Sequence, residues 1–212
     1  VSSEALWRDA YRIKRGGFDF VNVSDFPHPH QFLCACDQYG IIVLDTCSDS
    51  RGRARQNHPC ILSLPDSRGV NVYGKAALAR REGSESEMIQ QVHDLASMRQ
   101  ASCKDSCFAD ALCNFFDTDY AHCNGVMSSA RLPKLSYYLF QSQRDIDETD
   151  LQAFAEPFCK LLSRWEPGQS RGVEVCTNCG SVELWVDGVS QGRKLVQYSG
   201  NMLHPTVKFD AV

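Results

Sequence analysis

The sequence lacks the features that mark several common classes of protein. No apolar run approaches the roughly 18 to 20 residues that cross a bilayer, and the longest basic cluster is the short Arg51–Arg55 stretch. With a formal net charge of −4, a surface that neutralises phosphates is not evident. Gly-Lys-Ser and Gly-Lys-Thr motifs are absent, which disfavours nucleotide-binding enzymes of the P-loop type. We therefore expect neither a nucleic-acid partner nor insertion into a membrane.

Cysteine is the component that needs an interpretation. The chain has 11 cysteines in 212 residues, an odd number and too sparse for a small disulfide scaffold. A chain of this length can bury a core without disulfides. We expect reduced thiols, some of them metal-bound or reactive, in a cytoplasmic protein. The alternative is a secreted domain with disulfides, and Asn22-Val23-Ser24 fits the glycosylation acceptor that such a domain could carry.

The hydrophobic pattern changes from strands to helices and back to strands, which predicts an α+β fold. Short apolar or alternating runs predict strands at 18–23, 31–36, 40–45, 60–64, 173–175, 182–186 and 194–198. Helical spacing predicts helices over about 84–98, from residue 107 to about 116, over 132–141 and over about 149–165. Asp187-Gly188 is a strong turn signal. We expect a strand-rich domain at 1–82, followed at 83–212 by a helical part and C-terminal strands.

The clearest motif is Cys176-Thr177-Asn178-Cys179-Gly180, which lies between two expected strands. Two thiolates at this spacing can face one tetrahedral ion, and the glycine allows the tight turn of a zinc knuckle. A closed structural site needs two more ligands, and the candidates are Cys34 with Cys36, Cys103 with Cys107, or His122 with Cys123. The motif predicts structural zinc; buried or disulfide-bonded thiols and redox chemistry are the alternatives.

A second cluster surrounds Cys107, which follows the polar residues Lys104-Asp105-Ser106. A cysteine that opens a helix has a stabilised thiolate, because the free amides and the positive end of the helix dipole lie beside it. Cys107 is therefore a candidate nucleophile. The alternative interpretation is a small buried apolar side chain, the commoner fate of a cysteine.

These residues resemble the papain-like cysteine proteases of nidoviruses, those of coronaviruses in particular. Cys107-Phe108 at the head of an apolar-faced helix resembles the nucleophile helix of that family, and Leu132–Leu139 resembles a later helix of the same domain. Val175–Cys179 resembles the first half of the family's zinc finger. The resemblance covers residues 100–190. No cysteine follows Cys179, so the second half of that finger is missing, and the chain departs from the family there.

The resemblance implies a catalytic histidine, and His204 is the only late one. As the base it would take the proton of Cys107, with Asp210 as a candidate to orient the imidazole and Gln100 as a candidate donor to the oxyanion. A solvent-exposed histidine near the chain end is the alternative interpretation of His204.

Two hypotheses follow. The first is a viral cysteine peptidase, or a peptidase-like domain, that acts on the viral polyprotein or on host ubiquitin-like modifiers in the host cytosol. The second is a non-catalytic, zinc-stabilised protein-interaction module, with Cys103, Cys107, Cys176 and Cys179 as ligands. Because both hypotheses use the same sulfur of Cys107, enzymatic activity stays an open question at this stage.

Overall fold

The architecture is that of a computed structural model of the 212-residue chain. It describes residues 2–24, 29–46, 61–63, 83–102, 109–112, 114–117, 124–147, 149, 154–162, 172–199 and 202–210. The contacts divide the chain into two compact units. Unit 1 comprises residues 1–59 and 152–154, and unit 2 comprises 60–151 and 155–212. The expected domain boundary at 82/83 stays a prediction.

Unit 1 is built on a strand–helix–strand unit. Helix α1 (Ser3–Arg15) begins where the Ser2 side chain accepts a hydrogen bond from the Ala5 N–H. Strand β1 (Phe20–Ser24), helix α2 (His30–Tyr39) and strand β2 (Ile42–Thr46) follow, and β1 and β2 pair in parallel. The helix is the crossover that a parallel pair requires. An aromatic cluster of Tyr11, Tyr39 and Phe154 packs within the unit, with ring centroids 5.3 to 5.9 Å apart.

The strand expected at 31–36 is wrong, because these residues lie in α2. Phe32, Ala35 and Cys36 are buried at helical spacing, and the run is short enough to fit either period. The helix ends at Tyr39. Gly40 has a φ of +65° and closes α2 as a left-handed C-cap, with its N–H donating to the Asp37 carbonyl.

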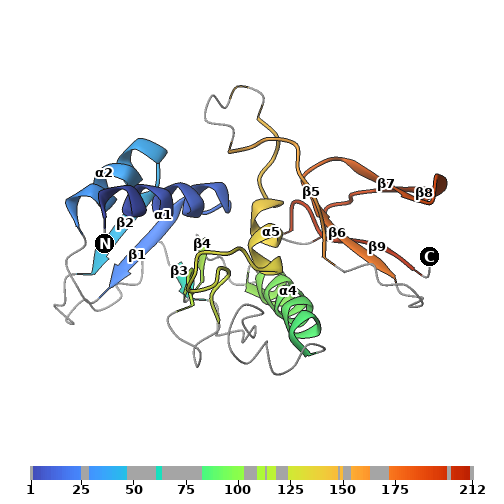
Figure 1. The fold of residues 1–212 in the computed structure, drawn as a ribbon, viewed down its shortest axis with the longest axis horizontal. Helices are drawn as coiled ribbons and strands as arrows, with labels where there is room; N and C mark the ends of the chain where they lie inside the picture. Colours follow the sequence, from blue (N-terminus) through green and yellow to red (C-terminus); the bar gives the residue numbers. More distant parts are fainter. Residues whose placement is uncertain are drawn as a thin grey trace. The chain divides into compact units, whose positions relative to one another are not determined.

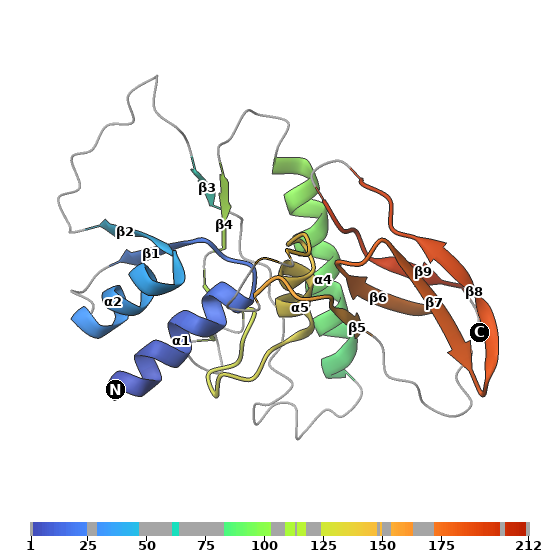
Figure 2. The same ribbon diagram turned by 90° about the horizontal axis from the view of Figure 1, so that it is seen from above.

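The helical part of unit 2 contains helices α4 (Gly83–Ser102) and α5 (Leu135–Gln141), which lie side by side (Figures 1 and 2). The helices expected over about 84–98 and 132–141 are confirmed by α4 and α5. Ser136 Oγ donates to Gln91 Oε1 at 2.8 Å across their contact, where both side chains are buried. Strands β3 (Ile61–Ser63) and β4 (Ala109–Ala111) form a second parallel pair.

The helix expected from Cys107 to about residue 116 is wrong over its described part. Residues 109–111 form β4, and Phe116 makes a bridge to Met127 in an extended conformation. Phe115 and Phe116 pack edge to face with centroids 4.8 Å apart, and the Arg131 guanidinium lies 4.2 Å from the Phe116 ring centroid. The apolar run therefore forms strand structure, which a short run cannot distinguish from a helix by periodicity alone.

The C-terminal part of unit 2 contains two small antiparallel sheets, drawn in orange and red in Figure 1. One sheet has the order β5–β6–β9, from β5 (Cys159–Leu161), β6 (Val173–Thr177) and β9 (Val207–Phe209). The other is the hairpin of β7 (Ser181–Val186) and β8 (Val189–Leu195). Four residues of the first sheet form a buried core against Val182, Leu184 and Val196: Val173, Val175, Val207 and Phe209. We refer to this pair of sheets as the β-sandwich.

The expected turn at Asp187-Gly188 is confirmed. Both residues have positive φ angles, of 48° and 79°, as a two-residue hairpin turn requires. The helix expected over about 149–165 is wrong, since residues 159–161 form β5. Phe158 stacks on Tyr138 of α5 with a centroid separation of 5.8 Å, and Lys160 Nζ lies 4.8 Å from the same ring centroid. Contacts with α5 thus hold this segment in an extended conformation.

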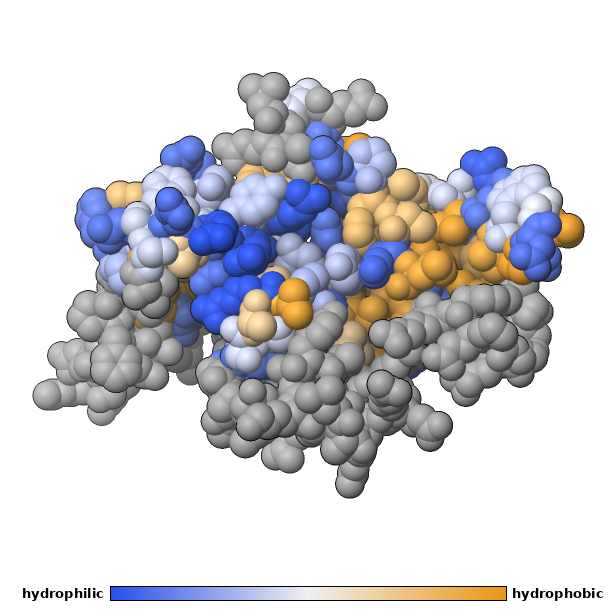
Figure 3. All heavy atoms as spheres, in the orientation of Figure 1, coloured by the Kyte–Doolittle hydropathy of each residue, from blue (hydrophilic) through white to orange (hydrophobic). Residues whose placement is uncertain are grey.

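Within the described parts of the chain, no helix is both long enough and apolar enough to cross a membrane. On the face shown in Figure 3, apolar side chains gather over the β-sandwich. The hairpin also exposes large apolar residues, among them Trp185, Val189 and Leu195.

Candidate functional site

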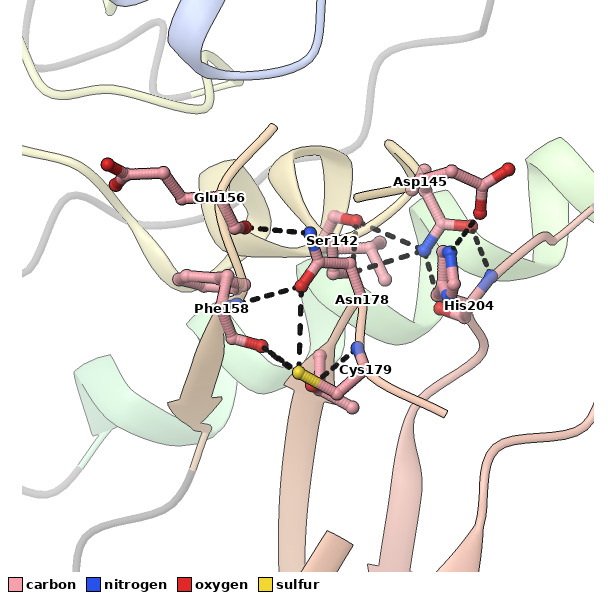
Figure 4. A network of polar contacts seen from close by, with 10 residues as sticks. Ser142, Asp145, Glu156, Phe158, Asn178, Cys179 and His204 are labelled. Atoms are coloured by element: carbon pink, nitrogen blue, oxygen red, sulfur yellow. Dashed lines mark hydrogen bonds and ion pairs between the residues drawn. The ribbon is translucent and has the colours of Figure 1, made fainter. Parts of the chain in front are cut away.

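The first polar cluster surrounds His204, which lies in the segment that precedes β9. His204 is buried, and its Nε2 lies 2.7 Å from Asp145 Oδ1. Because an ionised carboxylate only accepts, Nε2 carries the hydrogen of this bond. Gln143 holds the backbone of the same residue: its Nε2 donates to the His204 carbonyl at 2.5 Å, and its Oε1 accepts from the His204 N–H at 3.2 Å. Figure 4 shows His204 beside Asp145. His204 is therefore fixed to the segment that follows α5.

The other residues expected beside His204 have different environments. Gln100, near the end of α4, donates from Nε2 to Ser199 Oγ at 2.8 Å, so it contacts the segment that leads toward His204. Asp210 is exposed just after β9, and no contact with the imidazole is present among the described residues. Asp145 takes the position beside the imidazole that the sequence analysis considered for Asp210. Cys107 lies outside the described residues, so its pairing with His204 stays a prediction.

A second cluster is centred on Glu174 of β6. Its Oε2 lies 2.8 Å from His93 Nε2 of α4, and its Oε1 accepts from Thr206 Oγ1 at 2.6 Å. Lys208 Nζ of β9 lies 3.6 Å from Oε1. Like the Asp145–His204 contact, this cluster joins the helical part of unit 2 to the β-sandwich. The two contacts fix the orientation of the sandwich on α4 and α5.

Among the residues that the structure describes, Asp117 and Lys134 form an ion pair that is completely buried. Both side chains have 0% exposure, and Lys134 Nζ donates to Asp117 Oδ1 at 2.8 Å. The Gly125 N–H donates to the same oxygen at 3.0 Å, whereas Oδ2 is buried without a hydrogen-bond partner. Burial raises the pKa of Asp117, although the hydrogen bond and the positive charge of Lys134 act in the opposite direction. The pair is inaccessible to a substrate, so its role is structural.

The two cysteines of the Cys-x-x-Cys motif have different surroundings. Cys176 in β6 is fully buried, and burial strongly raises the pKa of its thiol while a hydrogen bond to Ser142 partly opposes this. Cys179 lies in the turn after β6, with its Sγ 3.9 Å from the Phe158 carbonyl oxygen. No cluster of three or more metal-ligating side chains occurs among the described residues. Cys103 lies outside them, so zinc binding stays a prediction and the zinc-knuckle detail of the expected fold is without support.

Helix α2 carries two free cysteines, Cys34 and Cys36, that differ in exposure, so their alkylation tests the burial of Cys36. Cys36 is fully buried, and burial together with the charge of Asp37 raises the pKa of its thiol to about 11. Cys34 is half-buried, with its Sγ 3.3 Å from His30 Nδ1. We expect iodoacetamide to alkylate Cys34 in the native protein and to leave Cys36 unmodified until urea unfolds the chain. Peptide mass mapping measures both sites, and equal labelling before unfolding would contradict the burial of Cys36.

One family model matches part of the chain, whereas the comparison with curated proteins gives no match. Residues 168–211, which form most of the β-sandwich, match the model of a domain of unknown function, DUF4982. No curated protein matches the sequence of the chain. The matched segment is about a fifth of the chain and carries no assigned activity.

Solved structures of bacterial glycosidases resemble nearly the whole chain. A β-glycosidase from Bacteroides vulgatus aligns over 99% of the chain with a TM-score of 0.65 and 16% identity. The β-glucuronidases of Parabacteroides merdae and Bacteroides uniformis each align over 100% of it with TM-scores of 0.60, at 17% and 14% identity. The chain covers 44%, 42% and 40% of these three proteins, respectively, so it spans less than half of their length. At these identities the likeness establishes the fold and not the activity.

These findings correct the functional hypotheses drawn from the sequence. The resemblance to viral papain-like proteases is wrong, because the fold is that of bacterial glycosidases. The peptidase function falls with it, as do the polyprotein and ubiquitin-like substrates and the host cytosol as location. The alternative of a zinc-stabilised interaction module also finds no support in these neighbours. A thiol followed by an aromatic residue was too short a motif to identify a family.

No local sequence pattern marks the residues that form these polar contacts. Asp145, Glu174, His93, Asp117 and Lys134 were not considered, because their partners lie 17 to 81 positions away in sequence. One signal was present: Lys134 follows Pro133 in the first turn of the helix expected over 132–141, where a charged side chain could turn inward. No local pattern distinguishes such a lysine from an exposed one.

Proposed function

We propose that the protein acts on β-linked glycosides and hydrolyses them. The observation that supports this most directly is the likeness of the whole chain to solved β-glucuronidases and a β-glycosidase, at TM-scores of 0.60 to 0.65. The substrate class is therefore a carbohydrate rather than a peptide. The chain spans less than half of the length of these neighbours, so hydrolysis by this chain is itself part of what is proposed.

The parallel strands indicate where such a site would lie. In parallel α/β folds, ligands bind beyond the carboxyl ends of the strands. Glycoside hydrolysis requires two carboxyl groups that flank the scissile bond. In unit 1, Asp45 stands one position before the end of β2, at the carboxyl end of the parallel pair. Asp45 is a candidate for one of the two carboxyl groups, whereas Asp117 is excluded by its burial against Lys134.

The test is whether the purified chain hydrolyses p-nitrophenyl β-D-glucuronide, galactoside or glucoside. The absorbance of the released nitrophenol measures the reaction. We expect at least one substrate to be cleaved, and Asp45→Asn to lower kcat by about 100-fold or more. Asp187→Asn is the matched control, because Asp187 lies in the exposed hairpin turn at a φ that Asn also tolerates. Absence of cleavage, together with absence of binding of the matching thioglycosides by calorimetry, would overturn the proposal.

A further inference from the structure

Two thiols lie close together at the edge of the β-sandwich. Cys159 opens β5, and in the antiparallel pairing of β5 with β6 it stands opposite Thr177. Residues that face each other in such a pair lie on the same face, with Cα atoms about 4.5 to 5.5 Å apart. Cys179 follows two positions after Thr177, in the turn that leads to β7. The register therefore brings Cys159 and Cys179 to the same end of the sheet.

Hydrogen bonds of Thr177 fold the turn back toward β5. Thr177 Oγ1 donates to the Phe158 carbonyl at 2.6 Å and accepts from the Cys179 N–H at 3.0 Å. The Cys179 sulfur lies 3.9 Å from the same carbonyl oxygen (Figure 4). That oxygen belongs to the peptide group joining Phe158 to Cys159, so standard bond lengths place the Cys179 sulfur within about 7 Å of the Cys159 Cα. A disulfide needs little more than a rotation of the side chains from this separation.

Asn178 holds the two segments together beside the thiols. Its Oδ1 accepts from the Phe158 N–H at 2.8 Å, and its Nδ2 donates to the Glu156 carbonyl at 2.9 Å. Burial raises the pKa of Cys159, and the charge of Cys179 adds to this effect. The approach of the two thiols is thus built into the hydrogen bonding of the turn.

We propose that Cys159 and Cys179 form a dithiol that small disulfides, such as oxidised glutathione, convert to an intramolecular disulfide. One thiolate attacks a sulfur of oxidised glutathione, whose disulfide bond breaks, and a glutathione thiolate leaves. The second thiolate then attacks the protein sulfur of the mixed disulfide and releases the second glutathione. Two protein thiols are oxidised, one glutathione disulfide is reduced, and the two protons pass to the two glutathione thiolates.

Cys176, in strand β6 beside β5, provides a matched control. It stands opposite Lys160 rather than Thr177, so its side chain lies on the other face of β6. It is fully buried, and its thiol interacts with Ser142 of the helical part. We therefore expect Cys159 to form the disulfide with Cys179 and not with Cys176, although Cys176 is closer to it in the sequence.

The test is to incubate the folded chain with excess oxidised glutathione, alkylate the remaining thiols, and map the peptides by mass spectrometry. We expect a peptide pair linked through Cys159 and Cys179, at least about tenfold more abundant than singly glutathionylated forms, because the second step is intramolecular. Cys159→Ser should leave a mixed disulfide on Cys179, and Cys176→Ser should not change the linked pair. Dithiothreitol should remove the link.

Three results would overturn the proposal. They are full alkylation of both thiols after incubation, separate glutathione adducts without the linked peptide, and a link from either thiol to a different cysteine. Circular dichroism of each serine variant shows whether it has folded. If Cys159→Ser does not fold, the linked peptide in the unmodified chain and in Cys176→Ser still decides between these outcomes.

Discussion

Replacing Lys134 with Met is expected to lower the free energy of unfolding by about 3 to 5 kcal/mol, the usual cost of removing one partner of a buried ion pair. The substitution leaves Asp117, whose side chain has 0% exposure, without its cation. Urea unfolding followed by circular dichroism measures the loss. The penalty should be smaller in mildly acidic buffer than at neutral pH. When folding raises the pKa of an acid, the protonated acid contributes stability at low pH, and this contribution is lost as the pH rises. Removal of Lys134 also removes an interaction that lowers the pKa of Asp117.

The double variant Asp117→Asn/Lys134→Met is the control for the charge. It removes both ionised groups while an amide oxygen can still accept from the Gly125 N–H, so part of the lost stability should return. Its stability should also no longer depend on pH through this site. A single-variant loss below about 1 kcal/mol would mean that water reaches the pair.

Replacing Phe209 with Ala is expected to cost about 3 to 5 kcal/mol, the usual range for a buried aromatic residue. Phe209 is 3% exposed in the core of the β-sandwich, and Lys194 Nζ lies 5.2 Å from its ring centroid. Leu195→Ala is the control, because Leu195 is 68% exposed on β8 and its loss should change stability by no more than about 0.5 kcal/mol. The two variants are compared by the same urea titration. Equal losses would contradict the assignment of the core.

The sequence predicted those elements whose local pattern admits one interpretation. The spacing of Val92 and Leu95 suits only a helix over the length of α4, and Asp187-Gly188 suits only a tight hairpin turn. Short runs were ambiguous: residues 31–36 form a helix that connects parallel strands, and the segment around Phe115 and Phe116 forms extended structure. Tertiary contacts decided these cases, because a run of about six apolar residues fits both periods.

The candidate polar sites were less accessible to sequence reasoning. His204 was selected for its place near the chain end, and it is buried, but its carboxylate partner is Asp145, 59 positions earlier. Cys176 and Cys179 were treated as one pair because of their spacing, whereas alternation along β6 and the turn after it give their sulfurs different neighbours. Pairing across a sheet follows from strand register, which the spacing of two cysteines does not reveal.

The segment matched by the family model is shorter than the part of the chain that the contacts of Glu174 and His204 join together. The family match covers residues 168–211, yet Glu174 relies on His93, and His204 relies on Gln143 and Asp145, all outside that range. Strand β6 also pairs with β5, which the match excludes. A peptide limited to the matched residues would leave these hydrogen-bonding groups and one sheet edge unpaired. We therefore expect the smallest segment that folds by itself to include α4 and α5, so that a domain boundary drawn at the limits of the family match would cut through these contacts.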